Sequence, residues 1–207
     1  MVQAREELQA EIATHRDAIA RLEARLEEAE GPRAADAWAP EGFYLTYYVV
    51  TGLMLGVLGS LVSFLANVVG SILVEQDPLL FLRVYGTVFL GQEALVTQDL
   101  SFFMLVAVVH FSVGALGGAV FHVLVSFKTP AKVTTTWALG AAYGFLMWVV
   151  NFYVVIEWVQ MSLYGQAYVL ELMPVWVAVL SHVLYGLTLG ALQPLGRWVP
   201  YQPAAAA

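Results

Sequence analysis

The chain has 207 residues, of which 60% are hydrophobic and 12% are charged, and its formal net charge is −7. Soluble domains are about half apolar and a quarter charged, so this composition excludes an ordinary water-soluble domain. The absence of cysteine excludes disulfides, thiolate metal sites and thiol nucleophiles, and the absence of a basic patch argues against a nucleic-acid partner. Residues 1–41 carry ten of the sixteen acidic side chains and five of the nine basic ones, so most of the net charge lies in the N-terminal segment.

Residues 1–31 are expected to form a cytoplasmic coiled-coil helix, which Gly31-Pro32 ends. Apolar residues recur alternately four and three positions apart over about three heptads. This seam consists of Leu8, Ile12, His15, Ile19, Leu22, Leu26 and Ala29, with Ile12, Ile19 and Leu26 at the a positions. β-branched residues at a with Leu at d favour two parallel strands. No other soluble helix covers the seam, so residues 1–30 are expected to bind another copy or other membrane subunits. The alternative is a solvated amphipathic helix on the membrane surface.

Four hydrophobic stretches follow a linker at residues 32–45. A helix needs roughly 20 apolar residues to cross the hydrocarbon core of a bilayer. The stretches that satisfy this are 46–74, 102–127, 133–158 and 173–195, and none contains Lys or Arg. We therefore expect an all-α, polytopic membrane protein with a four-helix transmembrane bundle over residues 46–198 and a tail at 199–207. No signal peptide is visible, so the first span is expected to serve as an uncleaved insertion signal.

The basic residues predict the direction of the spans. Four spans place both termini and the middle loop on one side of the membrane, and that side holds eight of the nine basic residues. They are Arg5, Arg16, Arg21, Arg25, Arg33, Lys128, Lys132 and Arg197. Because loops rich in Lys and Arg remain on the cytoplasmic side, both termini are expected to be cytoplasmic in a bacterial-type inner membrane.

The first outer loop is itself hydrophobic and is expected to contain a helix at about residues 78–90. Asp77 would be its N-cap, with Pro78 at the first helical position. The helix is too short to span a bilayer. We expect it either to lie flat at the outer interface or to dip back between the spans.

Glycines recur at four-residue spacing in every span. In lipid, helices associate by close packing at such small residues. The glycines concerned are Gly52, Gly56, Gly114, Gly118, Gly140, Gly144, Gly186 and Gly190. The phrase His-x3-Gly-x3-Gly occurs at His110 and again 72 residues later at His182. This repeat suggests two hairpins related by a pseudo-twofold axis along the membrane normal, with the glycine faces lining the inside of a compact bundle.

Each span also carries one polar residue at about the same depth: Asn67, His110, Asn151 and His182. Polar residues at membrane depth are costly unless they are paired, which makes this set a candidate site. In one interpretation the four side chains hydrogen-bond across helices and fix the register. In the other, His110 and His182 are axial ligands of a buried b-type haem, similar to those of cytochrome b bundles. A quinone head group or a proton path through the same residues is a further alternative.

Three sequence segments are similar to a known group of proteins: Trp137–Tyr153 (WALGAAYGFLMWVVNFY), Ser181–Gly190 (SHVLYGLTLG) and His110–Gly118 (HFSVGALGG). They resemble a widespread group of small, uncharacterised four-span membrane proteins of bacteria and archaea that have no assigned activity. The resemblance covers about Thr51 to Leu195 and leaves out the coiled-coil segment, which looks like an addition. It implies the four-span topology and no mechanism.

From these patterns we expect a non-catalytic integral membrane subunit that scaffolds or stabilises a larger membrane complex, respiratory or photosynthetic, through its glycine-packed helices and its coiled coil. The first alternative is an electron-transfer membrane anchor that binds a b-haem or a quinone through His110 and His182. The second is a small channel or transporter. No enzyme activity and no metal site is expected, since the sequence lacks a phosphate loop, a zinc-protease helix and a plausible Ser/His/Asp set.

Overall fold

The structure is a computed structural model that describes residues 2–30, 43–75, 77–127 and 132–198 of the chain. Every element in these ranges is helical, and they contain no strand. The chain divides into two compact units, residues 1–41 with 199–207 and residues 42–198. The expected tail lies outside the described residues. So does the expected linker, apart from its last three residues, which already belong to a helix.

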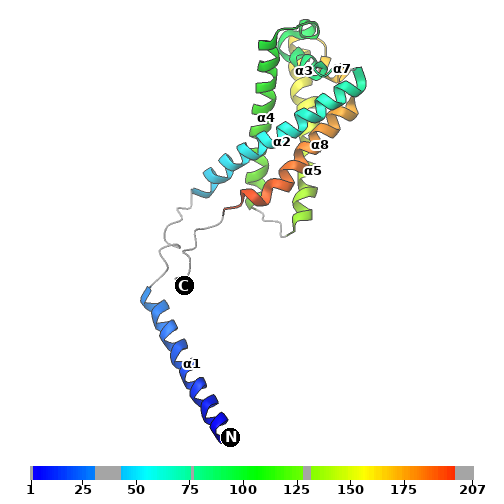
Figure 1. Cartoon of the computed structure of the whole chain (residues 1–207). Helices are drawn as coiled ribbons and strands as arrows, with labels where there is room; N and C mark the ends of the chain where they lie inside the picture. Colours follow the sequence, from blue (N-terminus) through cyan, green and yellow to red (C-terminus); the bar gives the residue numbers. More distant parts are fainter. Residues whose placement is uncertain (1, 31–42, 76, 128–131, 199–207) are drawn as a thin grey trace. The chain divides into compact units, whose positions relative to one another are not determined.

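The first unit is described as a single helix, α1 (Val2–Glu30), shown in blue in Figure 1. Ile12, Ile19 and Leu22 on this helix are 50%, 55% and 62% exposed. The members of the seam whose side chains lie outside the described part of the structure are Leu8, Leu26 and Ala29. The helix therefore has an exposed apolar stripe, and the coiled coil remains a prediction.

The second unit contains four helices that are long and apolar enough to cross a membrane. They are α2 (Phe43–Glu75), α4 (Leu100–Phe127), α8 (Val175–Leu192) and the continuous helix made of α5 (Val133–Val150), η2 (Asn151–Ile156) and α6 (Glu157–Tyr164). In hydrocarbon every backbone N–H and C=O must be bonded internally, which helices achieve within one segment. The chain is a multi-pass membrane protein, as its four hydrophobic stretches predicted.

The spans differ from their predicted ends: α2 begins three residues and α4 two residues earlier than expected, and the third and fourth spans differ as well. The third, expected to stop at residue 158, continues to Tyr164, where Gly165 ends the helix with a φ of +70°. Glycine adopts this left-handed conformation without steric cost, which explains why the helix ends there. The fourth was expected from residue 173. It begins instead at Val175, because Pro174 is its N-cap and a short helix, α7 (Tyr168–Leu172), precedes it.

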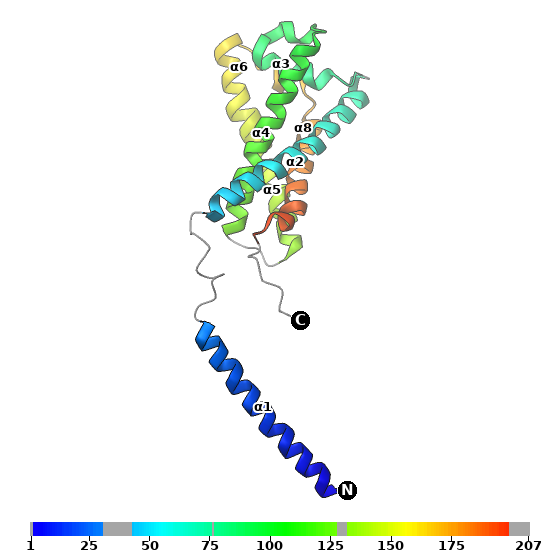
Figure 2. The ribbon, with the colours of Figure 1, turned by 60° about the vertical axis from the view of Figure 1, so that its left-hand side comes forward.

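The four spans pack as two antiparallel pairs. α2 packs along α4 and α5 packs along α8, while α2 also crosses α8 and so joins the pairs (Figure 1). α6 continues the line of α5 (Figure 2). α4 and α5, which belong to different pairs, make little contact. The pairs correspond to the two hairpins expected from the sequence, and their pseudo-twofold relation remains a prediction.

The larger hydrophobic core lies at one end of the bundle, where α3 (Leu80–Leu90), η1 (Gly91–Leu95) and α7 pack onto the spans. We call this the α3 end. Its fully buried members are Phe81, Ala94, Val169 and Ala178. A smaller core at the opposite end contains Leu55, Phe121 and Leu189. η3 (Gln193–Gly196) follows α8 at that opposite end.

The helix expected at residues 78–90 is present as α3 and starts two residues later than predicted. Asp77 is not its N-cap. One oxygen of its carboxylate accepts the backbone N–H of Leu79 at 2.9 Å, in a turn that precedes the first helical residue, Leu80. Gly86 and Thr87 are buried, and α3 packs against α4 and α7. The helix is therefore part of the packed fold.

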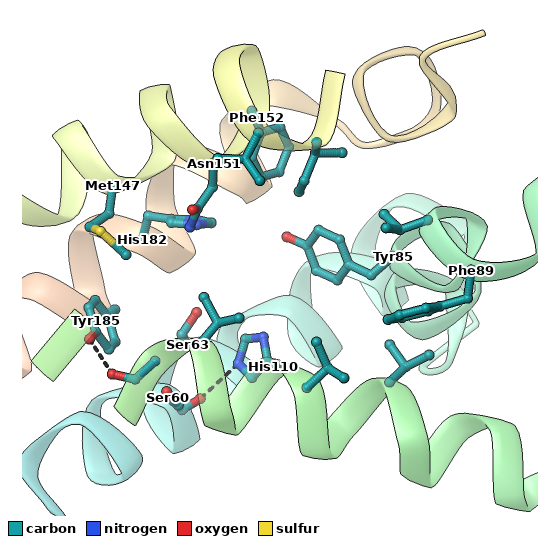
Figure 3. A pocket seen from close by; sticks show the side chains of 17 residues that line it. Ser60, Ser63, Tyr85, Phe89, His110, Met147, Asn151, Phe152, His182 and Tyr185 are labelled. Atoms are coloured by element: carbon teal, nitrogen blue, oxygen red, sulfur yellow. Dashed lines mark hydrogen bonds between the residues drawn. The ribbon is translucent and has the colours of Figure 1, made fainter. Parts of the chain in front are cut away.

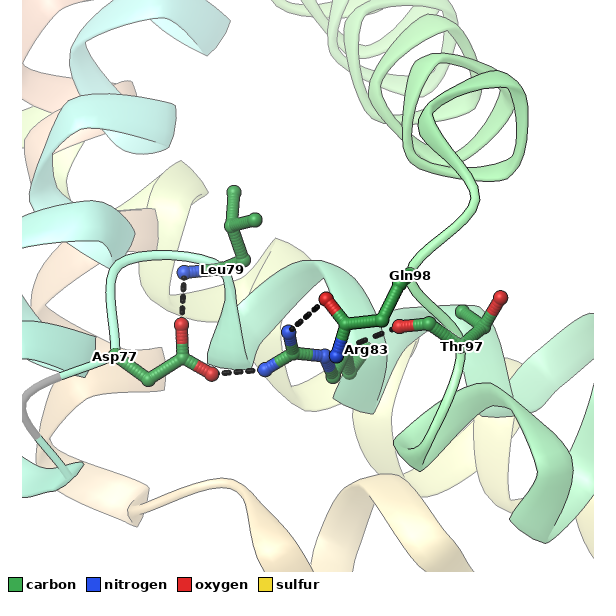
Figure 4. A network of polar contacts seen from close by, with 5 residues as sticks. All are labelled: Asp77, Leu79, Arg83, Thr97 and Gln98. Atoms are coloured by element: carbon green, nitrogen blue, oxygen red, sulfur yellow. Dashed lines mark hydrogen bonds and ion pairs between the residues drawn. The ribbon is translucent and has the colours of Figure 1, made fainter.

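Arg83 fastens α3 to the loops on both of its sides (Figure 4). Its guanidinium pairs with the second oxygen of Asp77 and donates to the Thr97 carbonyl and the Gln98 side-chain oxygen, each at 3.4 Å. It also lies 5.7 Å from the centre of the Phe103 ring, a cation–π distance. One side chain thus ties the start of α3, the segment after η1 and the start of α4.

Candidate functional site

A cavity of about 340 Å³ lies between the two helix pairs (Figure 3). α2 and α4 form one wall, α5, η2 and α8 form the opposite wall, and α3 lies at one end. Most of the lining is apolar, including Val106, Val109, Val113, Val155 and Ile156. The cavity exists because α4 and α5, unlike the other neighbouring spans, do not pack closely together.

Three of the four polar residues expected at one depth line this cavity: His110, Asn151 and His182. Asn151 and His182 lie on one side of it, and His110 from α4 and Ser63 from α2 lie on the other (Figure 3). His110 donates from Nε2 to the Ser60 carbonyl at 3.2 Å, so its Nδ1 is an acceptor in the neutral ring. His182 donates from Nδ1 to the Ala178 carbonyl at 2.8 Å, so its Nε2 is the acceptor.

Asn67, the fourth residue of that set, does not line the cavity. It is fully buried, and its amide N–H donates to the Ser63 carbonyl one turn earlier at 3.0 Å. Its side-chain oxygen has no hydrogen-bond partner within the described structure. Equal depth in the membrane was therefore not enough to bring all four residues together. Depth does not determine the direction in which a side chain leaves its helix.

The cavity also receives polar groups that form no hydrogen bond with other residues. No hydrogen bond of the described residues involves the hydroxyl of Ser63, the hydroxyl of Tyr85 or the side-chain amide of Asn151. The Tyr85 hydroxyl reaches into the cavity from α3 (Figure 3). Burial raises the pKa of this phenol, so the hydroxyl stays protonated and remains a donor. Neither Ser63 nor Tyr85 was predicted as a site residue, since neither stands out in its segment.

Two tyrosines connect the helix pairs, and one of them, Tyr185, lines the cavity at the end opposite to α3. Tyr185 on α8 donates to the Gly114 carbonyl on α4 at 2.6 Å, and Tyr143 on α5 donates to the Gly117 carbonyl at 2.7 Å. The α4 glycines make their carbonyls accessible because they have no side chain. Neither tyrosine was distinguished by sequence from the aromatic residues of a membrane protein.

The eight glycines singled out in the sequence lie at two helix–helix contacts. Gly52 and Gly56 of α2 meet Gly114 and Gly118 of α4, whereas Gly140 and Gly144 of α5 meet Gly186 and Gly190 of α8. A Cβ on Gly118 would overlap the backbone of α2, and one on Gly186 would overlap the backbone of α5. The glycine faces therefore hold each pair together instead of lining one common interior, and the cavity occupies the space between the pairs.

Asn151 begins the π-helical turn η2. At its end, the backbone N–H of Glu157 bonds to the Phe152 carbonyl, five residues back instead of four. Such a turn holds one residue more than an α-helical turn and is frequent at functional sites. Here it lies where the third span passes the cavity, and it supplies Asn151, Phe152, Val155 and Ile156 to the lining.

A buried glutamine holds α3 in place at its end of the cavity. Gln160 on α6 is fully buried, donates to the Thr87 hydroxyl at 2.8 Å and accepts the backbone N–H of Val169 at 3.0 Å. Thr87 in turn donates to the Val84 carbonyl at 2.5 Å. Both hydrogen-bonding ends of the amide are thus used between α3 and α7, which positions the helix that carries Tyr85. Gln160 has a positioning role that the sequence analysis missed.

A second, entirely apolar hollow of about 340 Å³ lies between α4 and α5. It shares Val113 and Met147 with the first cavity, so the two lie side by side. Leu116, Val120 and Leu146 on its rim are more than half exposed. In a bilayer such side chains face acyl chains, which makes the hollow a side opening toward lipid.

The remaining buried histidine lies away from the cavity. His122 is 1% exposed and donates from Nε2 to the Gly196 carbonyl at 3.0 Å, which holds η3 against α4. Over the described parts of the chain, no three His, Cys, Asp or Glu side chains are grouped so that they could hold a metal ion.

These features define a class: a four-span helical membrane protein with a mostly apolar cavity that a few polar side chains line, beside an apolar hollow between α4 and α5. No family model matches the chain, and neither a curated protein nor a solved structure matches it.

Proposed function

We propose that the bundle binds one neutral, lipophilic molecule whose head forms hydrogen bonds, and that a quinone or its quinol suits the cavity best. The observation that carries this proposal is the set of unbonded polar groups around an otherwise apolar cavity: the Ser63 and Tyr85 hydroxyls, the Asn151 amide and one nitrogen each of His110 and His182. A buried polar group without a partner costs about 1–3 kcal/mol, which a complementary ligand would offset.

The chemistry of the lining favours a neutral head. Within the described structure no Asp, Glu, Lys or Arg lines the cavity, so a charged head would lack a counter-charge. A quinone oxygen would accept hydrogen bonds from Tyr85 and Asn151, and a quinol hydroxyl would donate to Nε2 of His182. The volume is at the small end of ligand pockets, roughly 300–1,000 Å³. It suits a single ring whose tail leaves through the opening between α4 and α5.

A b-haem held by His110 and His182 is the alternative. His182 has the arrangement typical of an iron ligand, with Nδ1 bonded to a carbonyl and Nε2 available. His110 has the opposite arrangement, because its Nε2 is bonded to the Ser60 carbonyl. Paired ligation would require that bond to break, so the geometry favours the quinone head. A Soret band in the purified protein would decide for the haem instead.

The test is to purify the protein in mild detergent, extract it with organic solvent and identify bound lipophiles by mass spectrometry. Affinity for a short-chain quinone is then compared between Tyr85→Phe and Tyr153→Phe. The control tyrosine lies on η2, is 46% exposed and does not line the cavity. Loss of one hydrogen bond of about 0.5–1.5 kcal/mol predicts roughly two- to tenfold weaker binding for Tyr85→Phe only. Equal affinities, or no bound lipophile and no measurable quinone binding, would refute the proposal.

A second proposed role is that of a non-catalytic subunit that scaffolds a membrane complex, respiratory or photosynthetic, through α1. The observation that supports it is the exposed apolar stripe of that helix. Deleting residues 1–30 should leave the bundle folded and change its oligomeric state or its recovery of partners in mild detergent. An unchanged profile on both counts would contradict this role.

For the orientation, we propose that both termini lie on the cytoplasmic side of a bacterial-type inner membrane, with the α3 end outward. The basic residues near the span ends support this. The chain has no cysteine, so single cysteines report sidedness cleanly. In intact cells an impermeant thiol reagent should label Gln98→Cys and not Lys132→Cys. The reverse pattern would overturn the assignment.

A further inference from the structure

The exposed stripe of α1 continues along a long, regular helix. α1 has 29 residues, which at 1.5 Å per residue is about 43 Å. Ile12, Ile19 and Leu22 lie seven and three positions apart along a narrow seam, and each is at least half exposed. All residues from 11 to 25 are exposed, those of the seam included.

The residues beside the seam indicate what covers it. In a parallel, in-register pair of helices, each g position faces the e position of the next heptad on the other helix, and these contacts set partner choice. With Ile12 and Ile19 at a, Glu11 is at g and Arg16 is at the facing e position. Two heptads further on, Arg25 is at g and Glu30 is at e.

These pairs make the helix complementary to itself. Glu11 would face Arg16 of the other copy, a pair of opposite charges that occurs twice by symmetry, and the sequence gives Arg25 and Glu30 opposite charges in the same two register positions. The remaining pair, Ala18 with Glu23, contains a single charge and no repulsion. β-branched Ile12 and Ile19 at a, with Leu22 at d, favour two parallel strands as well.

We infer that α1 pairs in parallel and in register with α1 of a second copy of this chain. The inference deepens the scaffold role proposed for α1 and is independent of the cavity. About three heptads, with His15 in place of an apolar d residue, form only a weak coiled coil in solution. Anchoring both chains in one membrane raises their effective concentration, so the pair is expected in the full-length protein and not in an isolated peptide.

The test uses the cysteine-free full-length chain in native membranes. Ile12→Cys and Leu22→Cys place a thiol at a and d, where equivalent residues of the two copies meet, and Asp17→Cys places one at the outer f position as the matched control. Mild oxidation should give a disulfide-linked dimer for positions 12 and 22 and at least fivefold less for position 17. Mass spectrometry should identify links between identical positions.

Charge exchange tests the identity of the partner. In the Leu22→Cys background, Glu11→Arg or Arg16→Glu alone sets like charges against each other, and the yield of dimer should fall about fivefold. The two changes together restore opposite charges and should restore the yield. No dimer at positions 12 and 22, equal yields at position 17, links to a different protein, or no recovery in the double variant would each overturn the inference. None of these results bears on quinone binding, so this inference can fail while the cavity proposal stands.

Discussion

The contact between α5 and α8 allows a quantitative prediction for Gly186→Ala. The added Cβ would overlap the Gly140 carbonyl oxygen and lie 2.8 Å from the Gly144 nitrogen and 2.9 Å from the Gly140 carbonyl carbon. Nonbonded heavy atoms prefer roughly 3.5–4.0 Å, so the helices must separate by about 1 Å. All three neighbours are backbone atoms and cannot rotate away. Overpacking of this kind costs about 2 kcal/mol, the middle of the observed range.

Thermal unfolding in detergent or bicelles measures this cost. For a protein of this size, 2 kcal/mol corresponds to a fall in Tm of about 4–8 °C. The Tm of the Gly118→Ala variant, at the α2–α4 contact, should fall by a similar amount, because the added Cβ also meets backbone atoms. The control is Ala142→Val, an exposed position on α5 that gains volume without meeting a neighbouring helix, and its Tm should stay within about 2 °C. If Gly186→Ala unfolds at the same temperature as the control, the close contact of the backbones is not what holds this pair together.

Two further changes address the ends of the cavity. Tyr185→Phe removes the hydroxyl that donates to the Gly114 carbonyl. The protein should lose about 1 kcal/mol of stability, and its Tm should fall by about 2–4 °C. A Tm equal to that of the wild type would show that this bond does not join the helix pairs. Gln160→Leu leaves the Val169 N–H without its acceptor, so hydrogen–deuterium exchange should become faster at Val169 and in α3 and stay unchanged in the α2–α4 contact. Unaltered exchange rates in α3 would contradict the positioning role of Gln160.

The spans were predictable from the sequence because lipid allows few alternatives. A stretch of apolar residues without charge must form a helix to bond its own backbone, so hydropathy located all four spans, with the largest error at the end of the third, residue 158 instead of Tyr164. Glycine spacing likewise identified the residues at the helix contacts, since only small residues permit such close approach.

The candidate site was only partly predictable, because it depends on angular positions and on a helix outside the spans. Asn67 and His110 were expected together on grounds of depth, yet Asn67 points away from the cavity. Successive side chains of an α-helix are about 100° apart around its axis, so an error of one or two positions places a side chain on another face. Tyr85 comes from α3, whose docking depends on the bond between Thr87 and Gln160, 73 residues away, and on the bond from Arg83 to Thr97 beyond the helix. No local pattern reports such contacts.

The π turn that starts at Asn151 makes the third span tolerant of a change in length. Deleting one residue from an ordinary α-helix turns everything beyond it by about 100° and would destroy its contacts. Deleting one residue between 152 and 155 would instead convert the π turn into an α-helical turn and leave the faces of α5 and α6 where they are. The shortened protein should keep its glycine contacts and its Gln160 network while the backbone around Asn151 tightens. Within the described spans, this is a place where evolution could remove a residue and alter the cavity without rebuilding the bundle.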